Sequence, residues 1–126
     1  MRILLDTHIF VWWLANDRKL PKAADPLILD PGNEIYVSAG SVWEIAIKAG
    51  LGQIQVDPAL VVAAIPKSGF QELPVTSRHA IEVGTLPKHH RDPFDRLLVA
   101  QSRIEPMHLL THDQQLAAYG DTILIV

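Results

Sequence analysis

Four acidic residues that lie far apart along this sequence could do chemistry together: Asp6, Glu44, Asp95 and Asp113. Carboxylates gathered within a few ångströms repel one another, so they either keep their protons or bind a cation that holds them charged. A site made of carboxylate and water oxygens is the kind that Mg²⁺ or Mn²⁺ prefers. Such a site supports metal-assisted hydrolysis of a phosphodiester bond, because the ion activates water and offsets the negative charge that develops on phosphate oxygens.

Short apolar segments alternate with helical patterns, and these elements must position the four carboxylates. Predicted strands cover residues 3–5, 35–37, 70–73, 107–110 and 122–126. Predicted helices cover residues 7–15, 21–29, 41–50, 57–65, 76–83, 92–104 and 113–118. This alternation predicts an α/β fold, with a mainly parallel sheet flanked by helices, in a single domain spanning residues 1–126.

The predicted elements bring the carboxylates to one edge of the sheet. Asp6 and Asp113 follow the strands at 3–5 and 107–110, while Glu44 and Asp95 lie in the first turns of helices. In open α/β sheets, ligands bind in the crevice outside the carboxyl ends of the strands. We therefore expect the four side chains to converge there.

Helix capping offers a simpler interpretation of several of these residues. Ser41 and Glu44 match a capping box, in which Glu44 only reaches back to the Ser41 amide. Asp92 before Pro93 is typical of an N-cap, and Asp95 then lies where negative charge suits the helix dipole. Each cap explains one residue, and none explains why all of them should converge.

Capping also offers an alternative for Asp113, which could begin the helix at 114–118. Asp6 is harder to explain in this way. A charged residue directly after a buried strand must be solvated, paired or bound to a cation.

Composition narrows the function classes further. The chain has 126 residues, 48% of them hydrophobic and 20% charged, and it has no cysteine. A disulfide scaffold, a thiolate zinc site and a cysteine nucleophile are therefore excluded. The net charge of −3 argues against nucleic-acid binding through a broad basic surface. No apolar stretch approaches the ~18 residues of a membrane span, so we expect a soluble, cytoplasmic protein.

Four motifs resemble those of PIN-domain proteins, and in particular the VapC-type toxins of bacterial toxin–antitoxin pairs. They are Leu4–His8, Val42–Ala46, His90–Gln101 and Leu109–Asp113, in this order along the chain. The Asp-Pro-Phe-Asp-Arg-Leu-Leu run within the third motif is the most distinctive of them. The resemblance implies a PIN-like three-layer sandwich that acts as an endoribonuclease dependent on Mg²⁺ or Mn²⁺.

By motif position, the resemblance implies that Asp6 and Asp95 make most of the direct metal contact. Glu44 would position or deprotonate the attacking water, and Asp113 would hold a second metal ion or a metal-bound water. Asp92 would support the metal ligands from behind or bind metal itself. Thr111 fits a position where a hydroxyl supports the site.

Candidate contacts to RNA phosphates are Arg96, Arg91 and Lys48, although Lys48 also suits a solvated helix face. A crevice of this kind suits single strands or loops of RNA. The pair His89-His90 lacks a helical partner at the spacing of a metal site, so we interpret it as a loop.

Partner surfaces are expected as well. Residues 9–14 are apolar around a whole helix, so part of Trp12 or Trp13 should meet another chain. The resemblance implies a homodimer and a cognate antitoxin that places basic residues in the acidic crevice. The chain shows no helix-turn-helix, so direct reading of DNA is not expected.

Two other functions compete with the nuclease. Aspartyl-phosphate phosphatases need a second Asp two residues after the nucleophile, where this chain has His8. A PIN-like module that binds protein or RNA without cleavage is the stronger alternative, and a test for metal-dependent RNA cleavage separates it from the nuclease.

Overall fold

The computed structural model describes residues 1–126, and its elements follow the predicted alternation. The strands are β1 (Arg2–Leu5), β2 (Glu34–Ser38), β3 (Gln71–Leu73), β4 (His108–Thr111) and β5 (Ile123–Ile125). The helices are α1 (Thr7–Ala15), α2 (Ala24–Leu29), α3 (Ala39–Gly50), α4 (Pro58–Lys67), α5 (Ser77–Thr85), α6 (Pro93–Ile104) and the 3₁₀ helix η1 (Gln114–Tyr119). None of these helices combines the length and the apolar character that a membrane span requires.

All five strands run parallel in one sheet, in the order β3-β2-β1-β4-β5. The predicted α/β fold is thereby confirmed, and the sheet is parallel throughout. In the central strand, Leu4 lies opposite Tyr36 of β2 and Leu109 of β4. Along the chain, β2 and β3 are added on one side of β1, and β4 and β5 are then added on its other side, so the direction of strand order reverses at β1. The crevice at this reversal lies between the carboxyl ends of β1 and β4.

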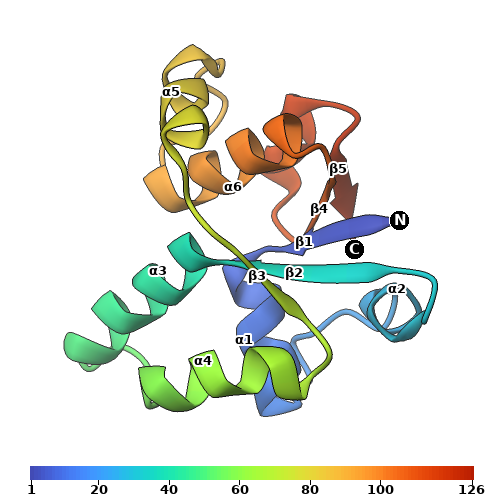
Figure 1. Ribbon diagram of the computed structural model, residues 1–126, viewed down its shortest axis with the longest axis vertical. Helices are drawn as coiled ribbons and strands as arrows, with labels where there is room; N and C mark the ends of the chain where they lie inside the picture. Colours follow the sequence, from blue (N-terminus) through green and yellow to red (C-terminus); the bar gives the residue numbers. More distant parts are fainter.

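Helices cover both faces of the sheet, which gives three layers (Figure 1). Ile3 and Leu5 belong to the core shared with α1 to α4, whereas Leu4 belongs to the core shared with α6 and η1. Successive side chains of a strand point to opposite faces, so β1 is buried on both. Helix α5 packs on α6, outside the sheet.

Helix α3 begins earlier than predicted, which rules out the alternative of a capping box between Ser41 and Glu44. Strand β2 ends at Ser38, whose hydroxyl caps the helix by accepting a hydrogen bond from the Gly40 amide at 2.9 Å. Ser41 lies within the first turn and instead accepts a hydrogen bond from the Thr7 hydroxyl at 2.8 Å. Glu44 therefore lies in the second turn and is not used as a cap.

A close approach between α3 and α6 forms part of the crevice. A Cβ atom added to Gly40 would lie 2.7 Å from Cδ2 of Leu97, so only glycine fits there without displacing that side chain. The contact brings the two helices that carry Glu44 and Asp95 together, and the carboxylate of Glu44 is close enough to raise the pKa of Asp95.

Candidate active site

The carboxyl ends of β1 and β4 are joined through one hydroxyl group. Thr111, the last residue of β4, donates a hydrogen bond to Oδ2 of Asp6 and accepts one from the backbone N–H of Asp113 at 3.0 Å. The Asp6 amide also donates to the Leu110 carbonyl at 2.9 Å, which continues the strand pairing by one residue. Thr111 therefore fixes two of the predicted acidic residues relative to each other.

Helix capping and membership of the acidic cluster are compatible because a carboxylate has two oxygens. Oδ1 of Asp6 accepts from the His8 amide, while Oδ2 accepts from Thr111. Oδ1 of Asp113 accepts from the Gln115 amide, while Oδ2 contacts a histidine in the crevice. The structure confirms the cap posed for Asp113, and it also makes Asp6 the N-cap of α1, which the sequence analysis did not predict.

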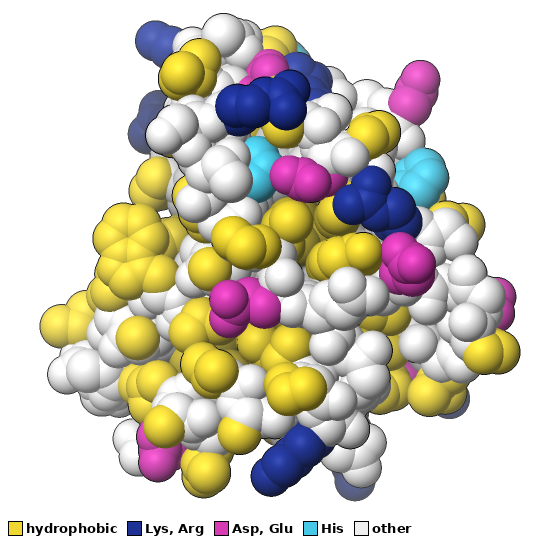
Figure 2. All heavy atoms as spheres, viewed as in Figure 1, with side chains coloured by type: hydrophobic (Ala, Val, Ile, Leu, Met, Phe, Trp, Pro, Cys, Tyr) yellow, Lys and Arg dark blue, Asp and Glu magenta, His cyan; other side chains and the backbone are white.

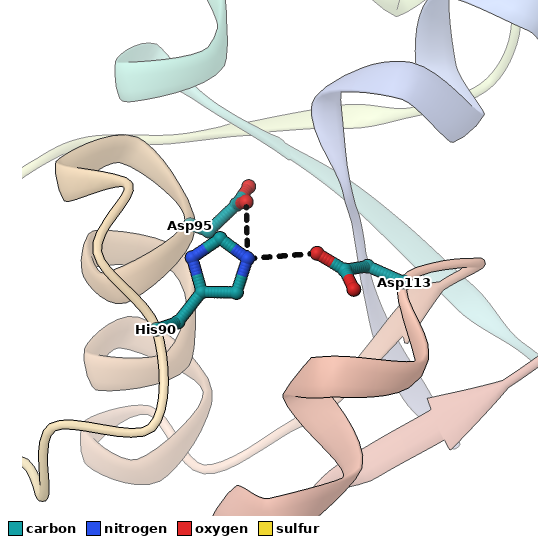
Figure 3. A group of neighbouring side chains, drawn as sticks. All are labelled: His90, Asp95 and Asp113. Carbon is teal, nitrogen blue, oxygen red and sulfur yellow. Dashed lines mark hydrogen bonds and ion pairs between the residues drawn. The ribbon is translucent and has the colours of Figure 1, made fainter.

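That histidine is His90, which lies between two of the acidic side chains (Figure 3). Its Nε2 lies 2.8 Å from Oδ2 of Asp113 and 3.5 Å from Oδ2 of Asp95. Its Nδ1 accepts a hydrogen bond from the backbone N–H of Asp92 at 3.1 Å. Because an N–H can only donate, the neutral ring must carry its proton on Nε2. His90 thus presents a donor to the carboxylates, and not the lone pair that a metal ligand needs.

Glu44 completes the group from helix α3. Its side chain is 3% exposed, and Oε2 accepts a hydrogen bond from Nζ of Lys48 at 2.7 Å. Oε1 is buried with no hydrogen-bond partner in the protein. A buried carboxylate oxygen without a partner is costly, so its presence points to a group that the protein itself does not supply.

The electrostatics of the cluster follow from burial and crowding. Burial raises the pKa of Asp95 to about 8, and the nearby charges of Asp6, Asp92, Glu44 and Asp113 act in the same direction. Burial also raises the pKa of Asp6, although hydrogen bonding from Thr111 opposes the effect. In the absence of a cation, part of this cluster therefore keeps its protons near neutral pH.

A divalent cation fits this set of residues. Oxygen donors for such an ion would come from the carboxylates of Asp6, Asp95 and Asp113, and the unpartnered Oε1 of Glu44 would face the ion or a water bound to it. Hard oxygen ligands of this kind suit Mg²⁺ or Mn²⁺. Bound positive charge would also remove the repulsion that raises the carboxylate pKa values.

Arg96 has a structural role, and its contact with RNA stays a prediction. Its guanidinium donates to the carbonyl oxygens of Val83 at 3.0 Å and Pro87 at 3.1 Å, and to the Tyr119 hydroxyl at 3.2 Å. Longer bonds reach the carbonyls of Leu86 and His90. A sequence cannot show that this fork of donors faces inward, where it holds the loop that carries His90.

We expect Arg96→Met to lower the free energy of unfolding by about 2–4 kcal/mol, because several backbone carbonyls lose a charged donor. Arg96→Lys should recover only part of this loss, since one ammonium cannot serve a fork of acceptors. Urea unfolding measures both variants, with Arg91→Met, an exposed position, as the control. Unchanged unfolding together with a higher KM for RNA would return Arg96 to the role of an RNA contact.

The other predicted cations and the loop histidines occupy different environments. Lys48 is held by Glu44 and is 32% exposed, so neither a free phosphate contact nor a purely solvated position describes it. Arg91 is exposed beside the crevice. His89 packs edge-on against Tyr119, with the ring centroids 5.1 Å apart. His89 and His90 lie in a loop, as predicted, and they diverge from each other.

Asp92 caps α6 as the sequence indicated. Its Oδ1 accepts hydrogen bonds from the amides of Phe94 at 2.8 Å and Asp95 at 3.2 Å. Its own amide also orients His90. Asp92 thus supports two side chains of the cluster through backbone contacts.

Thr111→Val should lower the free energy of unfolding by about 1–2 kcal/mol, because the variant removes the donor to Asp6 and the acceptor for the Asp113 amide. Thr111→Ser keeps the hydroxyl and should lose less. Chemical unfolding of the two variants side by side measures the difference. A larger loss in Thr111→Ser than in Thr111→Val would mean that the methyl group, and not the hydroxyl, is what matters.

His90 is the site residue that sequence reasoning missed. The loop was predicted correctly, but its return to the crevice was not. One feature of the sequence could have indicated this return: His90 lies two residues before the Asp92 cap. If α6 starts at the crevice, the residues just before its cap must also lie near the crevice. The pairing of Glu44 with Lys48 had a clearer signal, the spacing of four residues on a helix.

Comparison with known proteins agrees with the fold. The chain belongs to the PIN-domain family, whose family model matches residues 3–121. Within that family the chain is of the VapC type. It is 30% identical over 119 residues to ribonuclease VapC22 of Mycobacterium tuberculosis (strain ATCC 25618 / H37Rv), covering 93% of this chain and 91% of that protein.

Solved structures share the same fold at lower sequence identity. VapBC2 from Rickettsia felis, bound to a DNA fragment from its promoter, aligns with a TM-score of 0.69 and 16% identity over 100% of this chain and 98% of that one. VapBC-1 from nontypeable Haemophilus influenzae aligns with a TM-score of 0.66 and 19% identity, covering 94% and 92% of the two chains. These likenesses support the predicted PIN-like architecture.

Proposed function

We propose that this protein is the toxin of a type II toxin–antitoxin pair, an endoribonuclease that hydrolyses RNA phosphodiester bonds with the help of Mg²⁺ or Mn²⁺. The observation that carries the proposal is the convergence of buried carboxylates, one of which has an oxygen with no partner in the protein. Its relative VapC22 is named a ribonuclease, which supports the same reaction class.

Each residue then has a defined part in the reaction. Asp6 and Asp95 would hold the cation from β1 and α6, and Asp113 would complete its environment on the open side of the crevice. Oε1 of Glu44 can accept a proton from the water that attacks phosphorus, as the P–O bond to the leaving oxygen breaks. When bound, the divalent ion supplies charge stabilisation and acidifies that water. Nε2 of His90 keeps the Asp113 carboxylate oriented.

The substrate must approach an acidic site with little help from basic residues. Lysine and arginine side chains are scattered over the face shown in Figure 2 and form no continuous field. Arg91 is the predicted phosphate contact that stays exposed beside the crevice. We therefore expect binding of single-stranded or looped RNA that depends on the divalent ion.

A protein partner fits the apolar part of the surface. Apolar side chains gather in the lower half of Figure 2, where α3 and α4 lie. A groove of about 410 Å³ between α1, α3 and α4 has mostly hydrophobic walls, including Val11, Leu14 and Leu60. Trp12 and Trp13 are half-buried against rings of their own chain, so the predicted homodimer stays a proposal. We place the antitoxin over the groove, with basic residues reaching the carboxylates.

The test is cleavage of total cellular RNA by the purified protein with Mg²⁺, with Mn²⁺ and with chelator. The proposal expects defined RNA ends that appear only with the divalent ion, and loss of cellular toxicity in Asp6→Asn. If the protein binds RNA but cuts none of it, and Asp6→Asn is as harmless as the parent, the chain is a binding module and the proposed hydrolysis is wrong.

A further inference from the structure

Aromatic side chains border the acidic site on the side of α1. A pocket of about 250 Å³ is lined by two carboxylates, Asp6 and Asp113, and by three rings, those of His8, Trp12 and His112. Of the three rings, that of His8 also contacts the acidic group, with its Nδ1 4.0 Å from Oδ1 of Asp6. The pocket thus has a charged wall and an aromatic wall within one small volume.

The rings form a continuous aromatic wall drawn from two elements. His8 and Trp12 are four residues apart on α1, and therefore on one face, with ring centroids 5.8 Å apart and planes inclined at 42°. His112 follows β4 and meets Trp12 edge-on, with centroids 6.1 Å apart. Its Nδ1 donates to the Val126 carbonyl at 2.6 Å, which fixes the ring. Trp12 is half-buried, whereas the His8 side chain is 58% exposed.

We propose that this aromatic wall binds one unpaired base of the RNA whose scissile phosphate lies at Asp6 and Asp113. The inference rests on the proposed function, because it takes the phosphate position from the acidic site. A nucleotide whose phosphate lies at these carboxylates must carry its own base, or the next one, across the same pocket. The pocket volume suits a single base and excludes a duplex.

The chemistry of the wall suits a base with little sequence preference. Every base has a π-face, and stacking on an aromatic side chain contributes about 1–3 kcal/mol per base. Because Nδ1 of His112 carries a proton, its neutral ring leaves Nε2 as an acceptor for an amino or imino group of a base. Stacking at this position would also explain recognition of single strands by a protein with few free cations.

Steady-state cleavage of a single-stranded RNA measures the contribution of Trp12. Trp12→Ala should raise KM roughly tenfold with kcat nearly unchanged, and Trp12→Phe should restore most of the loss because a ring is kept. Trp13→Phe is the matched control, since Trp13 packs against Phe70 and is absent from the pocket. Circular dichroism of each variant shows whether its overall helix content matches that of the parent.

A substrate with an abasic nucleotide on either side of the cleaved bond tests the contact itself. Removing the stacked base should raise KM for the parent protein and add nothing further in Trp12→Ala. An unchanged KM in Trp12→Ala overturns the base-binding pocket. So does a tenfold difference in KM between Trp12→Ala and the parent that persists with every abasic substrate. Weaker antitoxin binding with unchanged RNA kinetics would assign the wall to a protein side chain and overturn it too.

Equilibrium binding separates this inference from the nuclease proposal. Fluorescence anisotropy of a labelled short RNA, measured with Ca²⁺, gives the affinity of the parent protein and of Trp12→Ala without turnover. Binding that weakens roughly tenfold in Trp12→Ala supports the pocket even if no cleavage occurs with Mg²⁺ or Mn²⁺, a result that would reject the nuclease alone. No RNA binding by the parent protein would reject the pocket.

Discussion

Asp95→Asn is expected to abolish RNA cleavage and, at the same time, to stabilise the metal-free protein near pH 8. The loss of activity should be at least about a thousandfold, because a ligand of the catalytic cation contributes several kcal/mol of charge stabilisation. The gain in stability follows because burial and four neighbouring carboxylates make the charged form of Asp95 unfavourable. Cleavage assays and thermal melts of the same preparation measure the two effects.

Asp92→Asn is the matched control for this variant. It makes the same chemical change three residues away, and asparagine caps helices about as well as aspartate does. We expect its melting temperature to stay close to that of the parent and its activity to fall far less. An unfolded Asp95→Asn protein would mean that the carboxylate is needed to begin α6, and it would favour the capping interpretation over the metal site.

The metal-free protein should lose stability as the pH rises from about 4 to about 8. The pKa of Asp95 is about 8 in the folded protein against 3.8 for the free side chain, so the folded state binds more protons throughout this window. Stability falls with pH wherever the folded state holds the extra proton, and we expect a total loss on the order of 5 kcal/mol. Urea unfolding in the presence of chelator, at intervals across this range, measures it.

Two comparisons assign this pH dependence to the acidic cluster. Asp95→Asn should flatten the profile, because the group responsible no longer titrates. Mg²⁺ or Mn²⁺ should raise the melting temperature of the parent more at pH 8 than at pH 6, since at the lower pH the ion must displace a proton. A profile that is equally steep in parent and variant would place the titrating group elsewhere.

The order and the type of the elements were predictable because they depend on local patterns. The apolar run at residues 3–5 predicted a strand buried on both faces, and Asp92 with Pro93 predicted the start of α6. The residue at which α3 starts was not predictable, because Ser38 and Ser41 are equally good caps in isolation. Strand β2 ends at Ser38, and this makes Ser38 the cap. The length of β2 is set by its pairing with neighbouring strands.

The acidic cluster itself was accessible from sequence because its members lie at strand ends and helix starts, which a parallel sheet brings to one edge. The contacts of the long polar side chains could not be predicted in the same way. The sequence predicted Arg96 as a phosphate contact and Lys48 as a phosphate contact or a residue on a solvated helix face. In the structure Arg96 fixes a loop and Lys48 pairs with Glu44. Their direction depends on which acceptors the packed helices leave unpaired.

The sequence by itself determined the α/β architecture and the four acidic positions, because hydrophobic periodicity and helix signals act over a few neighbouring residues. Only the tertiary structure decided that His90 donates to Asp113, that Oε1 of Glu44 has no partner and that Trp12 borders the acidic site. Such contacts join residues far apart in the chain, and their geometry depends on how the helices pack against the sheet.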